Sequence, residues 1–509
     1  MRKQLLAFSL LAFSVSGCDL APDFKLPDVL MPAAFKEETA VQAPTVAPAS
    51  DGKWKRFDEH AQIEEFAWWR MFNTPALDSV MELAMKDNPS LEVAVQRVNA
   101  ARAVAEEAGA DLYPTVSLGF GPERQRLSPA TLNATAPPGF VIPSKPYTLY
   151  TANGTISYEL DLFDKNRNTA RAATHDEEAE EANYRAARLS LQADIAQTYF
   201  RIASLRMEEG ILKKTIATRE DALKATREKV NAGMSNTLEL STFETDLANV
   251  KVDAAGVAQE LAISEHALAI LVGKPPSELK IETAELKAAP PIVPAGLPST
   301  LLERRPDIKQ AEKQIAAANA RIGVARAGYF PDISLSATGG FVAKDLSNLF
   351  QWSNRSWLIG PLAGTIITQP IFEGGAIAAA RAEVEADYQG AVANYRASVL
   401  NAFREVEDQL SGTRNIATQS VEINNALDAA TRAYSVAKQR YEVGYSSHLD
   451  YLDAERSYLA AQRNRVEIIG NQYVTTIQLV KALGGSWQAP SKPESTGQTP
   501  LATNNTPAK

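Results

Sequence analysis

The sequence has only one cysteine, Cys18, and four histidines among its 509 residues. One cysteine cannot form an intrachain disulfide, and the histidines lie too far apart for the ligand spacing of a metal site. The histidines are His60, His175, His266 and His448. The sequence also lacks a phosphate-binding loop and a GxSxG motif. We therefore expect no enzymatic activity, no catalytic residue, no metal site and no cofactor.

The sequence is also poor in positive charge and in long apolar runs. Its net charge is -9 at pH 7, which gives no electrostatic support for binding nucleic acid. After the N-terminal segment, no apolar run approaches the roughly 20 residues of a membrane-spanning helix. If the mature chain crosses a bilayer, we expect it to do so with strands.

The first residues are typical of a secretory signal peptide. Two cationic residues precede an apolar run that ends at Val15, and small residues follow up to Cys18. Residues 1–17 are therefore predicted to be removed. The residues VSGC that end at Cys18 resemble a bacterial lipobox, in which the cysteine is lipidated and begins the mature chain. The alternative is an ordinary cleavage site beside an unmodified cysteine.

The mature sequence contains an internal repeat. Residues 88–118 align without gaps with residues 305–335, and residues 227–244 match residues 438–455. Two copies are too few for a solenoid. The repeat therefore indicates two similar halves that close on each other by symmetry.

Both halves predict the same elements in the same order. A short Ala-rich helix begins at Pro89 or Pro306 and ends before a second proline. Two segments with the alternation of a strand then enclose a loop rich in small residues. A very long helix, a turn at a glycine and a medium helix complete each half. The predicted long and medium helices are about 166–232 and 237–271 in the first half, and about 375–443 and 449–483 in the second.

The number of strands has a consequence for assembly. Two hairpins supply only four strands, whereas the smallest membrane barrels need about eight. Several chains must therefore pool their strands if a barrel forms. The alternative is a soluble coiled-coil protein with short surface hairpins, which leaves the symmetric placement of the strands unexplained.

Five short motifs occur in an order that resembles one family, the TolC-like outer-membrane efflux proteins, in the lipoprotein branch of tripartite drug pumps. The resemblance covers nearly all of the mature chain. The motifs are CDLAPDF at 18–24, WW at 68–69, GLPSTLLERRPDI at 296–308, YFPDISL at 329–335 and QPIFEGGA at 369–376.

The resemblance implies a mixed α and β membrane protein built from a tandem structural repeat. Three chains are expected to form one twelve-stranded transmembrane β-barrel, with four strands per chain, continued by a long periplasmic α-helical barrel. The implied divisions are a signal peptide (1–17), a lipidated N-terminus and equatorial segment (18–87), a first repeat (88–273, strands about 113–162, helical tip about 230–238), a Pro-rich equatorial connector (274–302), a second repeat (303–485, strands about 330–372, helical tip about 441–449) and a disordered tail (486–509).

The resemblance also implies the function and the partners. The homotrimer is expected to be a passive exit channel for small molecules or drugs, served by a periplasmic adaptor and an inner-membrane RND-type transporter. Its expected place is the outer membrane, in contact with outer-membrane lipid, anchored through Cys18 and extending into the periplasm. Asp19 bears on this sorting, because in enteric bacteria an aspartate after the lipidated cysteine is associated with retention in the inner membrane. The alternatives are a lipid-anchored periplasmic scaffold without a pore, and an exit duct for secreted proteins or metal ions.

Two acids near the second tip are candidate gate residues. Asp450 and Asp453 are spaced to lie on one helix face, and the first half has Glu239 and Thr242 at the equivalent positions. By resemblance, the two aspartates face the channel axis and form two rings of three carboxylates, which favour cations in a pore. Tyr441 matches a tyrosine used in gate closure, whereas Ser446 stands where some members have an arginine. The alternatives are capping at a helix N-terminus and, less in keeping with the lack of histidine, a catalytic pair or a metal site.

The tip residues are also candidates for adaptor docking. Glycines permit the chain reversals, and small polar residues beside them leave room for a hairpin of the adaptor. These candidates are Gly233, Ser235, Asn236, Gly444, Ser446 and Ser447. The alternative is that they are turn residues only. Arg304 and Arg305 are interpreted as a structural pair at the start of a helix rather than as a binding patch.

Overall fold

The computed structural model describes residues 18–29, 32, 34–37, 67–126, 128, 145–283, 286, 289–291, 293, 304–359 and 365–485. The predicted signal peptide and the predicted tail lie outside the described residues, as does part of the connector. The described chain forms two compact units. Unit 1 draws on residues 1–28, 95–183 and 308–398, and unit 2 on residues 29–94, 184–307 and 399–509. Each unit therefore combines segments from both halves of the repeat.

The long and medium helices match the predicted ones to within about a residue at their ends, whereas the short helices end three residues earlier than predicted. The short helices α3 and α8 have 22 residues each, and the long helices α5 and α9 have 67 residues each. Their bounds are α3 Pro89–Ala110, α5 Lys165–Asn231, α6 Thr237–Val272, α8 Pro306–Ala327, α9 Ala376–Glu442 and α10 His448–Ala482. A proline begins both α3 and α8, where its missing N–H has no helical partner to lose. The short helices therefore have the same length in both halves, and so do the long helices.

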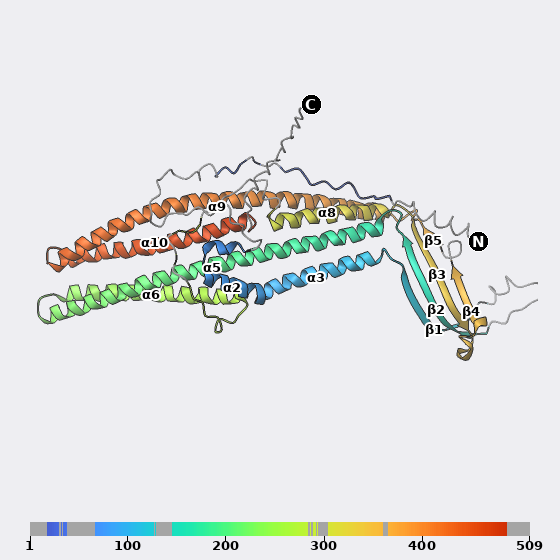
Figure 1. Ribbon diagram of the computed structural model, residues 1–509, viewed down its shortest axis with the longest axis horizontal. Helices are drawn as coiled ribbons and strands as arrows, with labels where there is room; N and C mark the ends of the chain where they lie inside the picture. The colour runs from blue at the N-terminus through green and yellow to red at the C-terminus, as the bar shows by residue number, and fades with distance from the viewer. Residues whose placement is uncertain are drawn as a thin grey trace, which may run out of the picture. The chain divides into compact units, whose positions relative to one another are not determined.

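Unit 1 contains one antiparallel sheet in the order β1-β2-β3-β4, with β5 also paired to β3 (Figure 1). The strands are β1 Thr115–Gln125, β2 Tyr147–Leu160, β3 Asp332–Ala343, β4 Arg355–Ile359 and β5 Thr365–Thr368. Four strands were expected, and the described residues form five, because the return of the second hairpin is divided into β4 and β5. Ala337 is opposite Ile359 but Leu335 is opposite Thr365, so two steps along β3 correspond to six along β4 and β5. Residues 360–364, between β4 and β5, lie outside the described residues.

The two faces of this sheet differ in polarity. Directly opposite residues of antiparallel strands share a face, so the register defines both faces. One face carries Val116, Leu118, Phe120, Ile156, Tyr158, Leu160, Ile333, Leu335, Ala337, Trp357, Ile359 and Ile367. The other carries Ser117, Thr155, Ser157, Glu159, Ser334, Ser336 and Thr338, with Leu149, Val342, Leu358 and Ile366 as exceptions. The apolar face is uncovered in the single chain: Leu118, for example, is 89% exposed.

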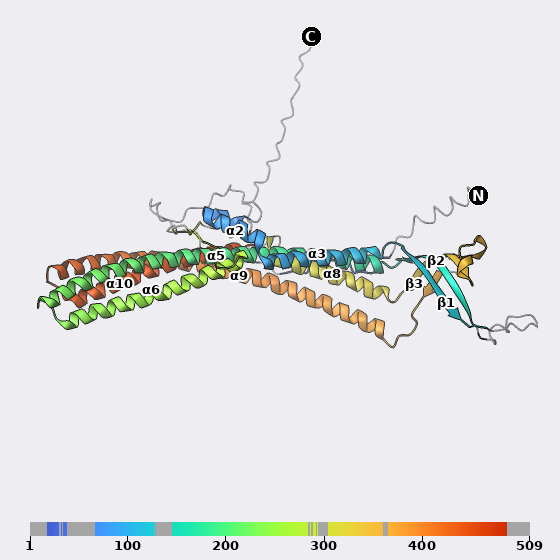
Figure 2. The same ribbon diagram turned by 90° about the horizontal axis from the view of Figure 1, so that it is seen from below.

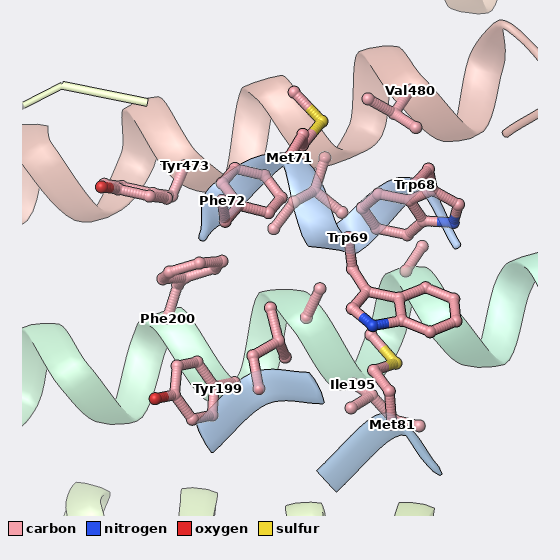
Figure 3. Close-up of a cluster of buried hydrophobic side chains, with 14 of the residues drawn as sticks. Trp68, Trp69, Met71, Phe72, Met81, Ile195, Tyr199, Phe200, Tyr473 and Val480 are labelled. Atoms are coloured by element: carbon pink, nitrogen blue, oxygen red, sulfur yellow. The ribbon is translucent and has the colours of Figure 1, made fainter. Parts of the chain in front are cut away.

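The main apolar cluster of unit 2 joins a short 3-10 helix, η2 (Trp68–Phe72), to α5 and α10. Figure 3 shows the rings of Phe72, Phe200 and Tyr473 grouped together. The centroid of the Phe72 ring lies 4.9 Å from that of Phe200 and 5.7 Å from that of Tyr473. Trp68 is buried and donates its Nε1–H to Oε1 of Gln192 at 3.0 Å. The helix α2 (Pro75–Asp87) follows and adds Leu77 and Met81 to this cluster. The aromatic motif that precedes the first repeat is therefore core.

Among the described helices, α6 has the length and apolar composition of a helix that could cross a membrane. The expectation of no such apolar stretch is thus corrected. Part of its apolar surface packs within unit 2, because Val250 and Val257 contact the cluster of Leu205 and Leu212 on α5. Another part is uncovered within one chain: Val252, Ile263 and Ile270 are 70%, 58% and 65% exposed.

Candidate functional site

The two helical tips of unit 2 have the same backbone design. Gly233 follows α5 with φ +71°, and Gly444 follows α9 with φ +79°, in the left-handed region that favours glycine. The N–H groups of Gly444 and Tyr445 return to the carbonyls of Tyr441 and Arg440. This is the Schellman pattern that ends a helix, and the first tip repeats it. Figures 1 and 2 show the two tips side by side.

The polar residues after each glycine cap the next helix. The Oδ1 atom of Asn236 accepts the N–H of Glu239 at 2.9 Å, at the start of α6. The Oγ atom of Ser447 accepts the N–H of Asp450 at 3.2 Å, and the Ser447 N–H donates to the Asp450 carboxylate at 3.2 Å. This reciprocal pair is a capping box at the start of α10. Four candidate docking residues, Ser235, Asn236, Ser446 and Ser447, therefore also have hydrogen bonds within their own tips.

Asp450 and Asp453 lie in different environments. The Asp450 carboxylate accepts hydrogen bonds from both Ser447 and Ser446, which lower its pKa below the ordinary value and keep it ionised. Asp453 has a side chain that is 74% exposed, and its carboxylate is 3.3 Å from Nη1 of Arg456. Capping thus accounts for the presence of an acid at 450, whereas Asp453 takes no part in the cap.

A hydrogen bond of 2.7 Å joins the two tips, from the Tyr441 hydroxyl on α9 to Oε1 of Glu239 on α6. The Tyr441 ring also stacks on the Tyr451 ring, with 5.3 Å between the ring centroids. Burial and the nearby Glu239 carboxylate raise the pKa of Tyr441. Partial burial acts to raise the pKa of Glu239, but hydrogen bonds from Ser235 and Tyr441 outweigh it, and the net shift is downward. Glu239 was not predicted as a site residue, although it stands at the position of the first half that is equivalent to Asp450, which was a usable signal.

A buried ion pair below the tips was also missed by the sequence analysis. Nε of Arg219 on α5 lies 3.1 Å from Oε2 of Glu455 on α10, and the two side chains are only 4% and 6% exposed. Nη1 of Arg219 also donates to the carbonyl of Asp246 on α6 at 2.9 Å. Arg456 forms a further ion pair with the Asp246 carboxylate. Three helices from both halves therefore meet at one polar cluster.

These geometries do not resemble a catalytic or metal site. Asp450 and Asp453 bind different partners, and within the described part of the chain no three His, Cys, Asp or Glu side chains are grouped to hold a metal ion. Arg305 is buried, donates to the carbonyl of Ala482 at 2.9 Å and pairs with Glu405 and Asp307 at 2.7 Å each. Arg305 therefore has the structural role that was predicted. Cys18 is exposed, at the start of the described chain.

Comparison with known proteins gives one consistent result. The family described as "Outer membrane efflux protein" matches residues 80–274 and 297–485. The toluene efflux pump outer membrane protein TtgC of Pseudomonas putida is 32% identical over 509 residues, covering 98% of each chain. The solved outer-membrane channel OprN superposes with a TM-score of 0.80 at 27% identity, covering 92% of this chain and 100% of that one. The CmeC outer membrane channel of Campylobacter jejuni gives a TM-score of 0.79 at 25% identity, covering 93% and 96%.

Proposed function

Because the chain belongs to the outer membrane efflux protein family, we propose that three copies form one channel with a twelve-stranded barrel and a helical tube. The chain is not an enzyme. Like its relatives and structural neighbours, it is an outer-membrane exit channel of an efflux pump. This excludes the scaffold without a pore. The trimer, the barrel, the gate and the partners are proposals about how this channel is built.

The observation that carries the proposal is the two-faced sheet of unit 1. Its apolar face is uncovered in the single chain, and its other face is mostly Ser, Thr and Gly. A membrane barrel needs apolar residues toward lipid and polar residues toward its lumen. β4 and β5 both pair with β3 and so occupy one strand position in the sheet. One chain then supplies four strand positions, and three chains supply twelve.

Neighbouring residues of β1 provide a direct test of this orientation. In membranes, Ser117→Cys should react with a charged, membrane-impermeant thiol reagent, because position 117 would face the aqueous lumen. Leu118→Cys should react at least about tenfold more slowly, because position 118 would face lipid, where a thiol stays protonated and unreactive. Labelling is measured by mass spectrometry, with the wild-type chain as the control for Cys18. Equal and rapid labelling of both positions would contradict a membrane-embedded strand.

The gate proposal assigns Asp450 and Asp453 to two carboxylate rings at the periplasmic tip, with Tyr441 as a latch. Its support is that the Asp450 carboxylate is held ionised and Asp453 is exposed. A ring of ionised acids attracts cations. The Tyr441 to Glu239 hydrogen bond supplies a contact between hairpins that closure needs, in a chain that has Ser446 instead of an arginine.

The tips are also the proposed docking surface for a periplasmic adaptor, which would connect the channel to an RND-type inner-membrane transporter. Exposed apolar side chains flank the docking residues, since Met234, Leu238 and Tyr445 are 75%, 75% and 87% exposed. Uncovered apolar side chains beside polar ones are typical of an interaction surface. TtgC is named for toluene efflux, so we propose small apolar molecules or drugs as the cargo, ahead of metal ions or secreted proteins.

We also propose that Cys18 carries the lipid that anchors the chain to the outer membrane. The thiol is exposed and is the only one in the sequence. Because the chain is an outer-membrane channel, Asp19 does not prevent outer-membrane localisation.

A further inference from the structure

The first described residues, 18–22, lie in a cradle built by two helices of unit 1. Helix α8 contributes Asn319, Gly323 and Arg326, which are spaced to lie on one helix face. Helix α5 contributes Asn168 and Arg171, which are three residues apart. The cradle residues thus come from both halves of the repeat.

Backbone groups of the segment bond to this cradle along its length. The Cys18 N–H donates to the carbonyl of Leu162 at 3.0 Å. Nη1 of Arg326 donates to the carbonyl of Leu20 at 3.1 Å, and Nδ2 of Asn319 donates to the carbonyl of Pro22 at 2.8 Å. Gly323 leaves the space for the chain, because a Cβ atom there would lie 3.0 Å from Cβ of Ala21 and 2.5 Å from Nδ2 of Asn168.

The Asp19 carboxylate accepts hydrogen bonds on both of its oxygens. Its Oδ1 accepts from Nδ2 of Asn168 at 3.0 Å and from the Ala21 N–H at 3.0 Å. Its Oδ2 accepts from Nη1 of Arg171 at 2.8 Å. The same Arg171 nitrogen donates to Oδ1 of Asn168 at 2.8 Å, and Asn168 itself is completely buried.

The charge of Asp19 suits this position. Partial burial acts to raise the pKa of Asp19, but the bonds from Arg171, Asn168 and Ala21 outweigh it and lower the pKa below its ordinary value. The carboxylate therefore stays ionised at neutral pH. An asparagine at position 19 would lose the charge-assisted bond to Arg171, which is the stronger kind of hydrogen bond.

We propose that Asp19 is a positioning residue, whose carboxylate clamps the N-terminal segment to α5 and α8 and so sets where the lipid of Cys18 leaves the folded chain. This inference rests on the proposed lipidation of Cys18. The clamp is compatible with that modification, because an N-acylated cysteine keeps one N–H and can still donate to Leu162. Both oxygens of Asp19 are occupied in the folded chain, which gives this residue a role other than sorting.

The test measures how often the segment leaves its cradle. Lys25 is exposed just beyond the clamp, and trypsin cleaves after lysine only when the surrounding backbone is free to enter the protease. Cleavage after Lys25 in detergent-solubilised trimers therefore reports the population of the released segment. The new N-terminus at Leu26 and the mass of the released peptide 18–25 are followed by mass spectrometry.

Asp19→Asn and Arg171→Gln should each accelerate this cleavage about fivefold, because a half-exposed ion pair contributes modestly. Asp23→Asn is the matched control, since no bond of the Asp23 side chain is found among the described residues, and it should cleave like the wild type. Gly323→Ala should also accelerate cleavage by pushing the segment away, while Gly390→Ala, with open space around it, should not.

Wild-type cleavage rates in Asp19→Asn and Arg171→Gln trimers would overturn the clamp. A change in the membrane fraction of Asp19→Asn without a change in cleavage would also overturn it, because Asp19 would then act in sorting only. The released peptide reports the proposed lipidation separately: a peptide without a lipid mass refutes lipidation, whereas the cleavage ratios still decide whether Asp19 clamps the segment.

Discussion

The Asp450 carboxylate has one observed role, in capping a helix, and one proposed role, in the gate. Asp450 is the third residue of α10 in a capping box with Ser447, and it is one of the two acids proposed to line the gate. The hydrogen bonds that make the cap also lower its pKa, so capping and a fixed negative charge support each other. Asp453 has no capping role, and its exposed carboxylate is only partly compensated by Arg456.

The charge of these residues can be removed without removing the cap. We expect the double variant Asp450→Asn with Asp453→Asn to assemble as the wild type and to lose most of its cation preference, because the amide oxygen of asparagine can still accept a hydrogen bond. The measurement is the reversal potential in a planar bilayer under a potassium chloride gradient.

The matched comparison is Asp450→Ala with Asp453→Ala, which should show the same loss of selectivity. It should also destabilise the start of α10 by about 1 kcal/mol, because the bond from the Ser447 N–H to the carboxylate is lost, whereas Oγ of Ser447 still accepts the backbone N–H of residue 450. An unchanged reversal potential in both double variants would refute the carboxylate rings.

At the scale of elements, the cluster below the tips joins helices that belong to different halves of the repeat. Burial raises the pKa of Glu455, and Arg219 opposes this shift without cancelling it. The carboxylate therefore depends on its partner. Since α5, α6 and α10 all contribute to the cluster, it connects the two hairpins and would resist the separation of the tips in the gate that we propose.

Removing one partner of this pair should cost more than removing both. Arg219→Met leaves Glu455 buried without a counter-charge, and we expect a local destabilisation of about 3 kcal/mol. Hydrogen exchange of peptides from α6 and α10 measures it. Arg219→Met combined with Glu455→Leu should recover at least half of that loss. If the double variant exchanged as fast as the single one, the pair would not be the source of the stability.

At the scale of the whole molecule, a single chain has free strand edges and exposed apolar side chains. Among the described strands, β1 pairs only with β2, and β4 and β5 pair only with β3. Such free edges recruit other strands. Helix α6 likewise exposes Val252, Ile263 and Ile270. The ring of identical chains that we propose would cover both the strand edges and this apolar surface.

Ring closure predicts disulfides between chains across the two sheet edges. Cysteines at Thr115, Ser117 or Gly119 of β1, each combined with Leu358→Cys of β4, should include one pair that yields covalent dimers and trimers on a non-reducing gel. The scan over three positions allows for the stagger between strands of a barrel.

The control is Thr155→Cys with Thr338→Cys, whose hydroxyl oxygens lie 3.1 Å apart across β2 and β3 within one chain. This pair should give only an intrachain disulfide. Covalent monomers as the sole product of every edge pair would contradict closure by neighbouring chains.

The sequence by itself determined the helices, the repeat and the class of protein. Helix lengths followed from uninterrupted periodicity between prolines and glycines, which is local information. The motifs and the strand alternation indicated an outer-membrane channel, and the family match agrees with that interpretation. The division of the return strand into β4 and β5 was missed because strand pairing depends on a partner strand.

Only the tertiary structure decided which side chains meet. The contacts of Tyr441 with Glu239, of Arg219 with Glu455 and of Asp19 with Arg171 join residues 202, 236 and 152 positions apart. No periodicity or motif specifies such pairs, because they depend on how segments far apart in the sequence pack against each other.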